Sequence, residues 1–404
     1  NPAPRYNARD SAIKLSKIHN AKLILGSATP SLESKFNALN KKYGYVKLTE
    51  KYGLSTSSEI KCVDMKIYYR ADKMKGLLTP ELYDAIQDKL LLGQQILLFQ
   101  NRRGYAPVIE CTTCGHIPKC RNCDVSLTFH QYSNSLKCHY CGFSEINQKK
   151  CLKCSSSKID MKGYGTQQIE EQIKSFFPKA RVDRMDWDTT RGKYSVDKIF
   201  EKFENYQIDV LIGTQMITKG LDFKNIGLVG VINADNILFF PNFRANEKAF
   251  QILTQVAGRA GRSSVKGSVI IQTFSPDNNI FELIKKQNHD GFYKKEIKER
   301  NQFNYPPYYR LIKIVIKSRD LDTLRIASNW LFQSLSNGFI YPIYGPFDPH
   351  ISKIKNEFIK QILIKYPNTT VRNKIKKHLM RSVESFESIA KFKIVKLNVD
   401  VDPN

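Results

Sequence analysis

The sequence predicts an α/β fold with a doubly wound, mostly parallel sheet, a cysteine-rich insertion and a small C-terminal α+β domain. Three observations support this prediction. Apolar strand-like runs alternate with amphipathic helix-like runs over residues 79–101 and 155–277, as in a parallel sheet covered by helices on both faces. Eight cysteines interrupt the alternation between Cys111 and Cys154, and after residue 277 the alternation stops.

The first 60 residues predict two helices and one strand. We expect a helix over residues 10–20 and a strand over the apolar run 22–25. Thr29 and Pro30 then offer an N-cap and a first-turn proline for a second helix over residues 31–38.

The elements of the parallel sheet follow from apolar periodicity. Thr79 and Pro80 begin a helix that carries Leu82 and Ile86 on one face and stops at Gly93. Further helices are expected over residues 166–177, 196–203 and 247–256, and strands over residues 95–100, 180–185, 208–212, 227–232 and 267–273.

The last part of the chain predicts a separate small domain. Residues 311–316 and 394–399 are strand-like, and residues 321–335 form an amphipathic helical pattern between them. We therefore expect an α+β domain made of strand, helix and strand.

The charge of the chain favours a polyanionic partner. The 404 residues hold 64 Lys and Arg against 38 Asp and Glu, a net charge of +26, and nucleic acid is the first candidate for such a basic protein. The alternative explanation of the charge is that all proteins of the source organism are basic, in which case the charge indicates no particular partner. No apolar run is long enough for a transmembrane helix, and we expect a cytoplasmic protein.

Eight of the nine cysteines form four Cys-x-x-Cys pairs, which is typical of zinc ligands in a large intracellular protein. The pairs are Cys111 and Cys114, Cys120 and Cys123, Cys138 and Cys141, and Cys151 and Cys154. They predict two zinc ions, each closed by four thiolates and therefore structural. A nested arrangement, with the inner two pairs on one ion and the outer two on the other, is favoured over a sequential one. Cys62 is left over as an ordinary buried thiol.

A short basic segment near residue 260 has the chemistry of a phosphate site. Gln255, Arg259 and Arg262 are spaced i, i+4, i+7, so a continuous helix would place them on one face. Arginine stays charged and presents several donors in one plane, which suits a triphosphate. The alternative is a basic surface helix that glycine weakens.

Polar turns follow several of the predicted buried strands. Leu25-Gly-Ser-Ala-Thr-Pro30, Phe99-Gln-Asn-Arg-Arg-Gly104 and Ile212-Gly-Thr-Gln-Met216 occur in this order before the Gln255 to Arg262 segment. Ligands bind at the carboxyl ends of strands in open α/β sheets. The set resembles the later motifs of superfamily 2 nucleic-acid helicases.

With eight cysteines inserted just after Asn101-Arg-Arg-Gly104, the chain resembles one family closely. That family is the bacterial primosomal replication-restart helicases, the primosomal protein N prime family. Further matching stretches are Gly163-Tyr-Gly-Thr166, Thr254 to Arg262 and the closing Asp400-Val-Asp-Pro403. The resemblance implies an ATP-dependent 3′ to 5′ DNA helicase with a RecA-like second lobe, which acts on forked and single-stranded DNA during primosome assembly at stalled or repaired forks. It also implies primosome and single-strand-binding proteins as partners; we expect a monomer that binds no membrane.

The resemblance also implies roles for individual residues. Arg262 would be the arginine finger on ATP with Mg²⁺, with Arg259 and Gln255 beside it. Gly220 and Asp222 would lie near the nucleotide.

Seven further residues are implied to touch the DNA strand or to couple nucleotide state to DNA grip. They are Ser27, Thr29, Arg102, Arg103, Thr166, Thr214 and Gln215. Ser27 and Thr29 would have the coupling role. For Arg102 and Arg103 the alternative is solvated surface charge.

The resemblance implies a division into five parts. These are residues 1–60 as the end of helicase lobe 1, 61–110 as a linker and the start of lobe 2, 111–154 as the two-zinc insertion, 155–277 as the rest of lobe 2, and 278–404 as the C-terminal domain.

One feature of the family is missing from the sequence. A helicase needs a phosphate loop that ends in Gly-Lys-Ser/Thr and an acidic Mg²⁺ motif, but the single Gly-Lys, Gly192-Lys193, precedes Tyr194. We therefore expect the C-terminal part of a longer protein, inactive as an ATPase by itself. The alternatives are another superfamily 2 repair translocase or RNA helicase with an acquired zinc ribbon, and a non-catalytic scaffold that binds zinc and DNA.

Overall fold

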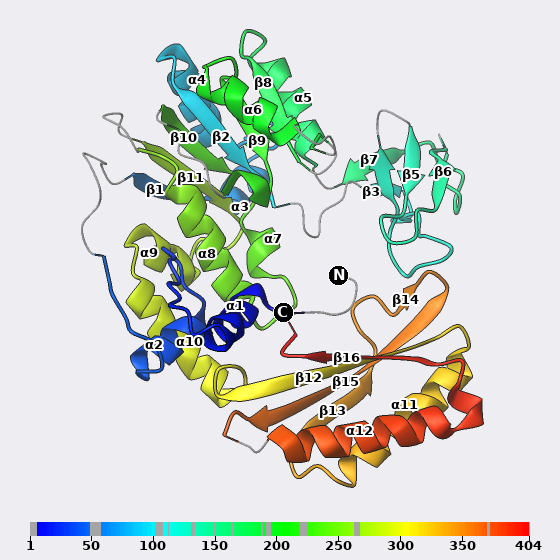
Figure 1. The fold of residues 1–404 in the computed structure, drawn as a ribbon. Helices are drawn as coiled ribbons and strands as arrows, with labels where there is room; N and C mark the ends of the chain where they lie inside the picture. The colour runs from blue at the N-terminus through cyan, green and yellow to red at the C-terminus, as the bar shows by residue number, and fades with distance from the viewer. Residues whose placement is uncertain are drawn as a thin grey trace. The chain divides into compact units, whose positions relative to one another are not determined.

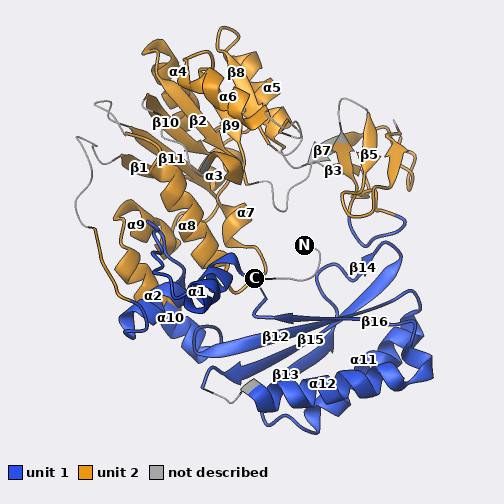
Figure 2. Ribbon diagram, viewed as in Figure 1, with its two compact units in different colours: residues 1–43, 121–125, 297–404 blue, residues 44–120, 126–296 orange. Residues whose placement is uncertain are grey.

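The structure is a computed structural model of the chain. It describes residues 6–48, 58–101, 108–111, 113–130, 134–148, 150–162, 165–186, 189–190, 195–218, 223, 225–261, 267–369 and 372–403. The chain divides into two compact units (Figure 2). The first comprises residues 1–43, 121–125 and 297–404, and the second comprises residues 44–120 and 126–296.

The second unit is built on a six-stranded sheet in the order β1-β11-β10-β2-β9-β8 (Figure 1). Every neighbouring pair in it is parallel. Its strands are β1 (Glu59–Asp64), β2 (Gln95–Phe99), β8 (Val182–Met185), β9 (Val210–Gly213), β10 (Ile226–Val231) and β11 (Ser268–Thr273). Because neighbours in the sheet are far apart in sequence, the connections are crossovers, and the doubly wound prediction is confirmed.

Helices connect and cover these strands. They are α3 (Met65–Arg70), α4 (Pro80–Leu91), α5 (Thr166–Phe176), α6 (Ser195–Glu204), α7 (Asp235–Leu238), α8 (Ala245–Ala257), α9 (Asn279–Lys285) and the 3₁₀ turn η1 (Gln215–Thr218), and α10 (His289–Gln302) follows. Thr79 caps α4 as predicted, by accepting a hydrogen bond from the N–H of Leu82. Leu82 and Ile86 of α4 are fully buried in the same hydrophobic cluster as Leu98 of β2, so the predicted apolar face of this helix packs on the sheet.

The cysteine-rich insertion lies between β2 and α5. Its strands are short: β3 (Val108–Cys111) pairs with β7 (Ile159–Lys162), and β4 (Thr128–His130), β5 (Ser135–Lys137) and β6 (Ser144–Ile146) form an antiparallel sheet. Strands of three or four residues bury little apolar surface. Interactions other than apolar packing must therefore stabilise the module.

The first unit contains an antiparallel sheet in the order β13-β15-β12-β16, with β14 paired to β15. The elements are β12 (Tyr309–Ser318), α11 (Leu321–Ser336), β13 (Ile343–Phe347), β14 (Lys353–Ile354), β15 (Glu357–Pro367), α12 (Arg372–Ser388), η2 (Ala390–Phe392) and β16 (Lys396–Val401), preceded by α1 (Ala8–Ile18) and α2 (Leu32–Leu39). Helices α11 and α12 lie along one face of the sheet (Figure 1), and Leu324 and Leu331 of α11 share a buried cluster with Ile314 and Ile362.

Three predictions about local structure need correction. Residues 22–25 form no strand, and Ile24 is 93% exposed; a strand requires a paired neighbour, and none of the described strands pairs with this run. The cap of α2 is Ser31 and not Thr29, because the Ser31 side chain accepts from the N–H of Ser34. The C-terminal domain also holds more than strand, helix and strand, since it includes β13, β14, β15 and α12.

Among the described helices, none combines the length and the apolar character that crossing a bilayer requires.

Candidate functional site

Polar residues follow three neighbouring strands at the carboxyl end of the parallel sheet. Asn101 follows β2, Thr214 and Gln215 follow β9, and Asp186 follows β8. The order β2-β9-β8 places these strand ends side by side. The Gln215 side-chain amide lies 3.4 Å from Oδ1 of Asn101, and the N–H of Thr214 donates to the carbonyl of Met185 at the end of β8. The predicted strand-end residues Thr214 and Gln215 are therefore brought to one edge.

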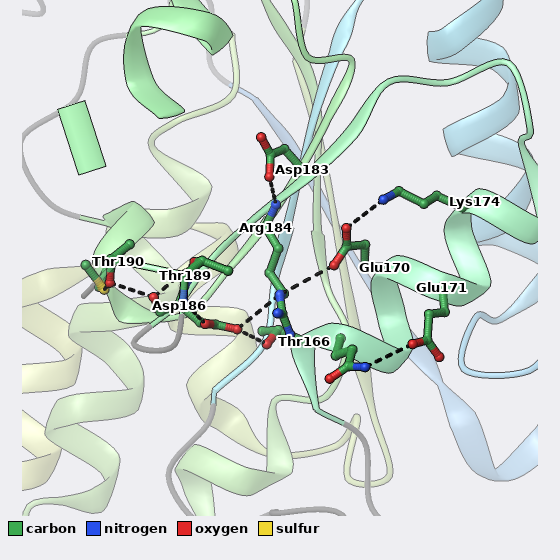
Figure 3. Close-up of polar contacts among 11 residues, drawn as sticks. Thr166, Glu170, Glu171, Lys174, Asp183, Arg184, Asp186, Thr189 and Thr190 are labelled. Carbon is green, nitrogen blue, oxygen red and sulfur yellow. Dashed lines mark hydrogen bonds and ion pairs between the residues drawn. The ribbon is translucent and has the colours of Figure 1, made fainter. Parts of the chain in front are cut away.

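Asp186 is the centre of this edge (Figure 3). Only 1% of its surface is exposed. One carboxylate oxygen, Oδ2, accepts the hydroxyl of Thr166 at 2.5 Å and lies 3.4 Å from Nε of Arg184, while Oδ1 accepts the N–H of Thr189 at 3.1 Å. Arg184 also lies 3.4 Å from Glu170. A buried carboxylate without such partners would carry a large desolvation penalty, so this set of contacts is what allows a charge here.

The same aspartate organises the turn after β8. The N–H of Asp186 donates to Oγ1 of Thr189, and the hydroxyl of Thr190 donates to the Asp186 carbonyl at 2.6 Å. Oγ1 of Thr190 also lies 3.7 Å from the sulfur of Met216, in the turn after β9. Asp186 thus joins the start of α5, the turn after β8 and, through Thr190, the turn after β9.

Thr166 is held inside this network. It is the first residue of α5 and is 4% exposed, and its hydroxyl donates to the Asp186 carboxylate. The N-cap Gly165 makes no side-chain cap hydrogen bond to the first turn of α5, whose N–H groups have no acceptor within the helix itself.

Helix α8 ends within one residue of its predicted end at residue 256, so it does not continue through the i, i+4, i+7 set. Its last residue is Ala257, Gly258 is the C-cap, and Gly261 has φ +74°. Gln255 is therefore helical, whereas Arg259 lies beyond the helix and is 8% exposed. The condition of a continuous helix is therefore not met, because Gly258 ends the helix before Arg259.

The end of α8 lies at the amino end of the sheet. The N–H of Gly261 points to the carbonyl of Ile226, the first residue of β10, at 3.4 Å. Helix α8 starts after the carboxyl end of β10, through α7, and its 13 residues extend about 20 Å. Residues 259–261 and the Asp186 edge therefore lie at opposite ends of one sheet.

The eight cysteines gather into two groups of four in which the ligand atoms lie within 4.8 Å of one another. The outer group is Cys111, Cys114, Cys151 and Cys154, and the inner group is Cys120, Cys123, Cys138 and Cys141. This is the nested arrangement that the sequence favours. Four sulfur ligands around one point fit a tetrahedral zinc ion and leave no open position for a substrate.

The backbone around the cysteines favours metal binding in two ways. Turns close three of the pairs, with the N–H of Gly115, Gly142 and Ser155 donating to the carbonyls of Cys111, Cys138 and Cys151 at 2.8–2.9 Å. Burial works to raise the pKa of Cys111, but hydrogen bonds from the backbone N–H groups of Cys114 and Thr113 lower that pKa to about 6.

The leftover Cys62 has different surroundings. Its thiol is partly buried, and burial raises its pKa to about 11. A thiol with this pKa is protonated at neutral pH and therefore a poor nucleophile and ligand.

Comparison with known proteins shows which family combines this parallel sheet, the cysteine-rich insertion and the C-terminal domain. Three family models match in succession: the PriA DNA helicase Cys-rich region over residues 120–145, the helicase conserved C-terminal domain over residues 133–264, and the primosomal protein N C-terminal domain over residues 301–404. The chain belongs to the PriA family of replication restart proteins.

Curated members of the PriA family align with nearly the whole chain. The replication restart protein PriA of Bacillus subtilis (strain 168) is 38% identical over 99% of this chain and 49% of its own length. The protein of the same name from Chlamydia pneumoniae is 38% identical over 99% of this chain and 53% of its own length. The chain thus spans about half the length of the curated relatives it matches.

A solved structure of RecG bound to a three-way DNA junction superposes on 62% of this chain and 23% of its own, at 10% identity and a TM-score of 0.35. That likeness is too loose to argue from.

Within this PriA-family chain, five of the residues predicted from the sequence lie outside the described residues. They are Arg102, Arg103, Gly220, Asp222 and Arg262. Their assigned roles stay predictions. Ser27 and Thr29 belong to the first unit, where Oγ of Ser27 accepts the N–H of Thr29 at 3.1 Å.

The sequence-based prediction missed Asp186. A signal was present, because an acidic residue directly follows a predicted strand and Thr189 and Thr190 come three and four residues later. Asp and Thr at these spacings favour side-chain to backbone hydrogen bonds in a turn.

Proposed function

We propose that this chain is the second motor lobe, the Cys-rich module and the C-terminal domain of an ATP-dependent DNA helicase of replication restart, which moves 3′ to 5′ along one strand of forked or single-stranded DNA. The observation that carries the proposal is the polar edge at the ends of β2, β9 and β8. It combines the amide side chains of Asn101 and Gln215 with the N-terminus of α5, which the Thr166–Asp186 hydrogen bond holds at this edge. Such groups contact phosphate and sugar without reading sequence.

The charge of the chain supports a nucleic-acid ligand. A net charge of +26 provides long-range attraction to a phosphate backbone. In this proposal Thr214, Gln215 and the residues that Asp186 positions grip the strand, and Arg102 and Arg103 add charge beside them.

The arginine segment would serve the nucleotide. Bound ATP with Mg²⁺ supplies the free energy of translocation. Arg262 would stabilise the charge that develops on the transferred phosphoryl group, with Arg259 and Gln255 beside it and Gly220 and Asp222 nearby. Gln255 is half-buried and Arg259 is buried. This supports side chains held in fixed positions and argues against solvated surface charge.

The two cysteine groups would hold two structural Zn²⁺ ions. Four thiolates per ion exclude water from the metal, so the ions would stabilise the module and do no chemistry. The short strands β4, β5 and β6 support this role, because their own packing is small.

The finer biological setting rests on the resemblance to the PriA family. The proposal includes primosome and single-strand-binding proteins as partners, a monomeric state and a cytoplasmic location. A repair translocase or RNA helicase with the same lobe, or a non-catalytic scaffold that binds zinc and DNA, is the competing function.

The deciding experiment measures DNA-stimulated ATP hydrolysis by the gene product extended upstream, since this chain contains no Gly-Lys-Ser/Thr phosphate loop. Arg262→Ala should lower kcat by about 10³–10⁵-fold, the range for loss of an arginine finger, while nucleotide binding is retained. Arg325→Ala is the matched control, because Arg325 is 62% exposed on α11.

Each outcome separates the candidates. Equal turnover in the wild type and Arg262→Ala would remove Arg262 from the mechanism, and no turnover in either protein would favour the scaffold. Stimulation by RNA duplexes and not by forked DNA would favour the RNA helicase.

A further inference from the structure

The tight turn between β14 and β15 lies against one of the cysteine pairs. Lys355 and Asn356 form the turn, with φ values of +52° and +61°, and Ile354 pairs with Glu357 on either side of it. Two successive residues with positive φ are typical of a type I′ hairpin. Such a turn is rigid, so the direction of its N–H groups is set by the backbone.

The N–H of Lys355 donates to Sγ of Cys123 at 3.2 Å. This donor lies 232 residues from the sulfur that it contacts. In two other pairs the N–H donor to sulfur is local, since Phe143 donates to Cys141 and Lys153 to Cys151 over two residues. The inner cysteine group therefore takes one of its N–H to sulfur bonds from the C-terminal domain.

Four more hydrogen bonds hold the turn in this position. The backbone N–H of Asp124 donates to the carbonyl of Lys353, and that of Asn356 donates to the carbonyl of Asn122, each at 2.8 Å. The side chain of Asn356 bonds that of Asn122 at 3.3 Å, and the hydroxyl of Ser352 donates to Asp124 at 3.1 Å. Residues 121–125 and the turn belong to the same compact unit.

Cys123 is 2% exposed, so water does not replace a lost donor at its sulfur. A metal-bound thiolate keeps part of its negative charge, and an N–H directed at the sulfur stabilises that charge and fixes the orientation of the ligand. Loss of such an outer contact typically lowers metal affinity 10–100-fold.

We propose that the β14–β15 turn completes the inner metal centre, with the N–H of Lys355 as a positioning donor to the Cys123 thiolate. The metal affinity of the inner group then depends on the C-terminal domain, and that of the outer group does not. By linkage, metal at the inner centre stabilises the turn by the same factor. The proposal is independent of the helicase function, because it concerns only metal binding and the hairpin.

The test compares Zn²⁺ release from the full 404-residue chain with and without the donor. Lys355→Pro removes the N–H and, because proline fixes φ near −65°, also shifts the turn away from its φ of +52°. Lys355→Gly keeps both the N–H and a backbone that tolerates positive φ. In competition with a chromophoric chelator, Lys355→Pro should lose one of two ions 10–100-fold more readily. Lys355→Gly should behave as the wild type.

Residue-resolved alkylation identifies which ion is lost. In Lys355→Pro, mass spectrometry should find Cys138 and Cys141 labelled by N-ethylmaleimide well before Cys111 and Cys114. Labelling of the outer pair at the same accelerated rate, or retention of both ions as in the wild type, would overturn the proposal.

A second variant covers the case in which Lys355→Pro does not fold, as circular dichroism would show. Ser352→Ala combined with Asn356→Gly removes two side-chain bonds and keeps the turn conformation, and it should loosen the inner ion about tenfold. With Co²⁺ in place of Zn²⁺, the sulfur-to-metal charge-transfer band should move to longer wavelength as the thiolate loses its donor. An unchanged band together with unchanged release would also refute the assignment.

Discussion

The two ends of the parallel sheet are built in different ways. At the carboxyl end, side chains link the segments that follow the strands: Asp186 bonds Thr166 at the start of α5 and Thr189 in its own turn, and Gln215 reaches Asn101. At the amino end the backbone itself is close-packed. A Cβ on Gly267 would lie 2.2 Å from the nitrogen of Gly261 and 2.6 Å from the carbonyl carbon of Ala260.

The difference lies in what a substitution would disturb. At the carboxyl end it removes polar partners, whereas at Gly267 an added methyl group would meet backbone atoms that cannot rotate away. Arg259 lies near this close-packed end and is only 8% exposed. We therefore expect substitutions at the two ends to fail in different ways.

The largest effect is expected from Asp186→Ala at the carboxyl end. The substitution leaves Arg184, the hydroxyl of Thr166 and the N–H of Thr189 without their shared acceptor. Removal of one partner of a buried ion pair costs about 3–5 kcal/mol, and we expect about 3 kcal/mol here because Glu170 still faces Arg184. The free energy of unfolding from urea titration measures this loss.

Asp183→Ala is the matched control for that measurement. Asp183 lies on the same strand, and among the described residues its carboxylate accepts a local N–H, that of Arg184. Its replacement should change the free energy of unfolding by less than about 1 kcal/mol. Equal losses in the two variants would contradict the central place of Asp186.

At the amino end, Gly267→Ala should destabilise by about 1–3 kcal/mol through overpacking. The added methyl group would meet the backbone of Ala260 and Gly261, which cannot rotate away as a side chain can. Gly93→Ala makes a poor control because Gly93 has φ +65°, but Gly44→Ala adds its methyl group to open space. Equal melting temperatures for Gly267→Ala and Gly44→Ala would contradict this prediction. They would show that the backbone near Gly267 can shift to accept the added methyl group.

The smallest effect is expected at the amino end from the ion pair of Arg181 and Asp209, which lie 2.6 Å apart. Partial burial raises the pKa of Asp209, but the side chain and backbone N–H of Arg181 outweigh it and hold the pKa below its usual value. Stability from this carboxylate is therefore present above the unfolded pKa of about 3.9 and is lost as the pH falls through the lower folded pKa.

Asp209→Asn should accordingly cost about 0.5 kcal/mol at pH 7, as for other partly exposed pairs. The difference from the wild type should vanish in acid, below the folded pKa, and urea titrations across that range measure it. A difference that grows as the pH falls would have the wrong sign for an ion pair.

Predictions based on local pattern succeeded in the second unit, whereas elements of the C-terminal domain were missed. The predicted strands and helices of the second unit all occur within a few residues of their expected bounds. Helix α12 was missed although its sequence carried a signal, since Ile375, Leu379 and Phe386 recur at helical spacing and are buried. Strand β15 was missed in the same region, where charged residues break the apolar run.

The site was harder to predict than the fold. The sequence placed Thr214 and Gln215 at a strand end because they directly follow a predicted strand, and their contact with DNA stays a prediction. Asp186 also follows one, but its importance depends on Thr166, which comes 20 residues earlier in the chain and reaches it only when α5 packs beside β8. The role of Asp186 is a property of the packed sheet.

The sequence by itself determined the alternation of strands and helices, the family and the eight cysteines of the two groups, because each depends on residues close together or on residue type alone. Only the tertiary structure decided where α8 ends relative to the sheet, which carboxylate organises the strand ends, and which distant N–H faces Cys123. The physical reason is that a hydrogen bond needs its partners within about 3 Å, and for residues as far apart as Cys123 and Lys355 only the packing of the folded chain brings them that close.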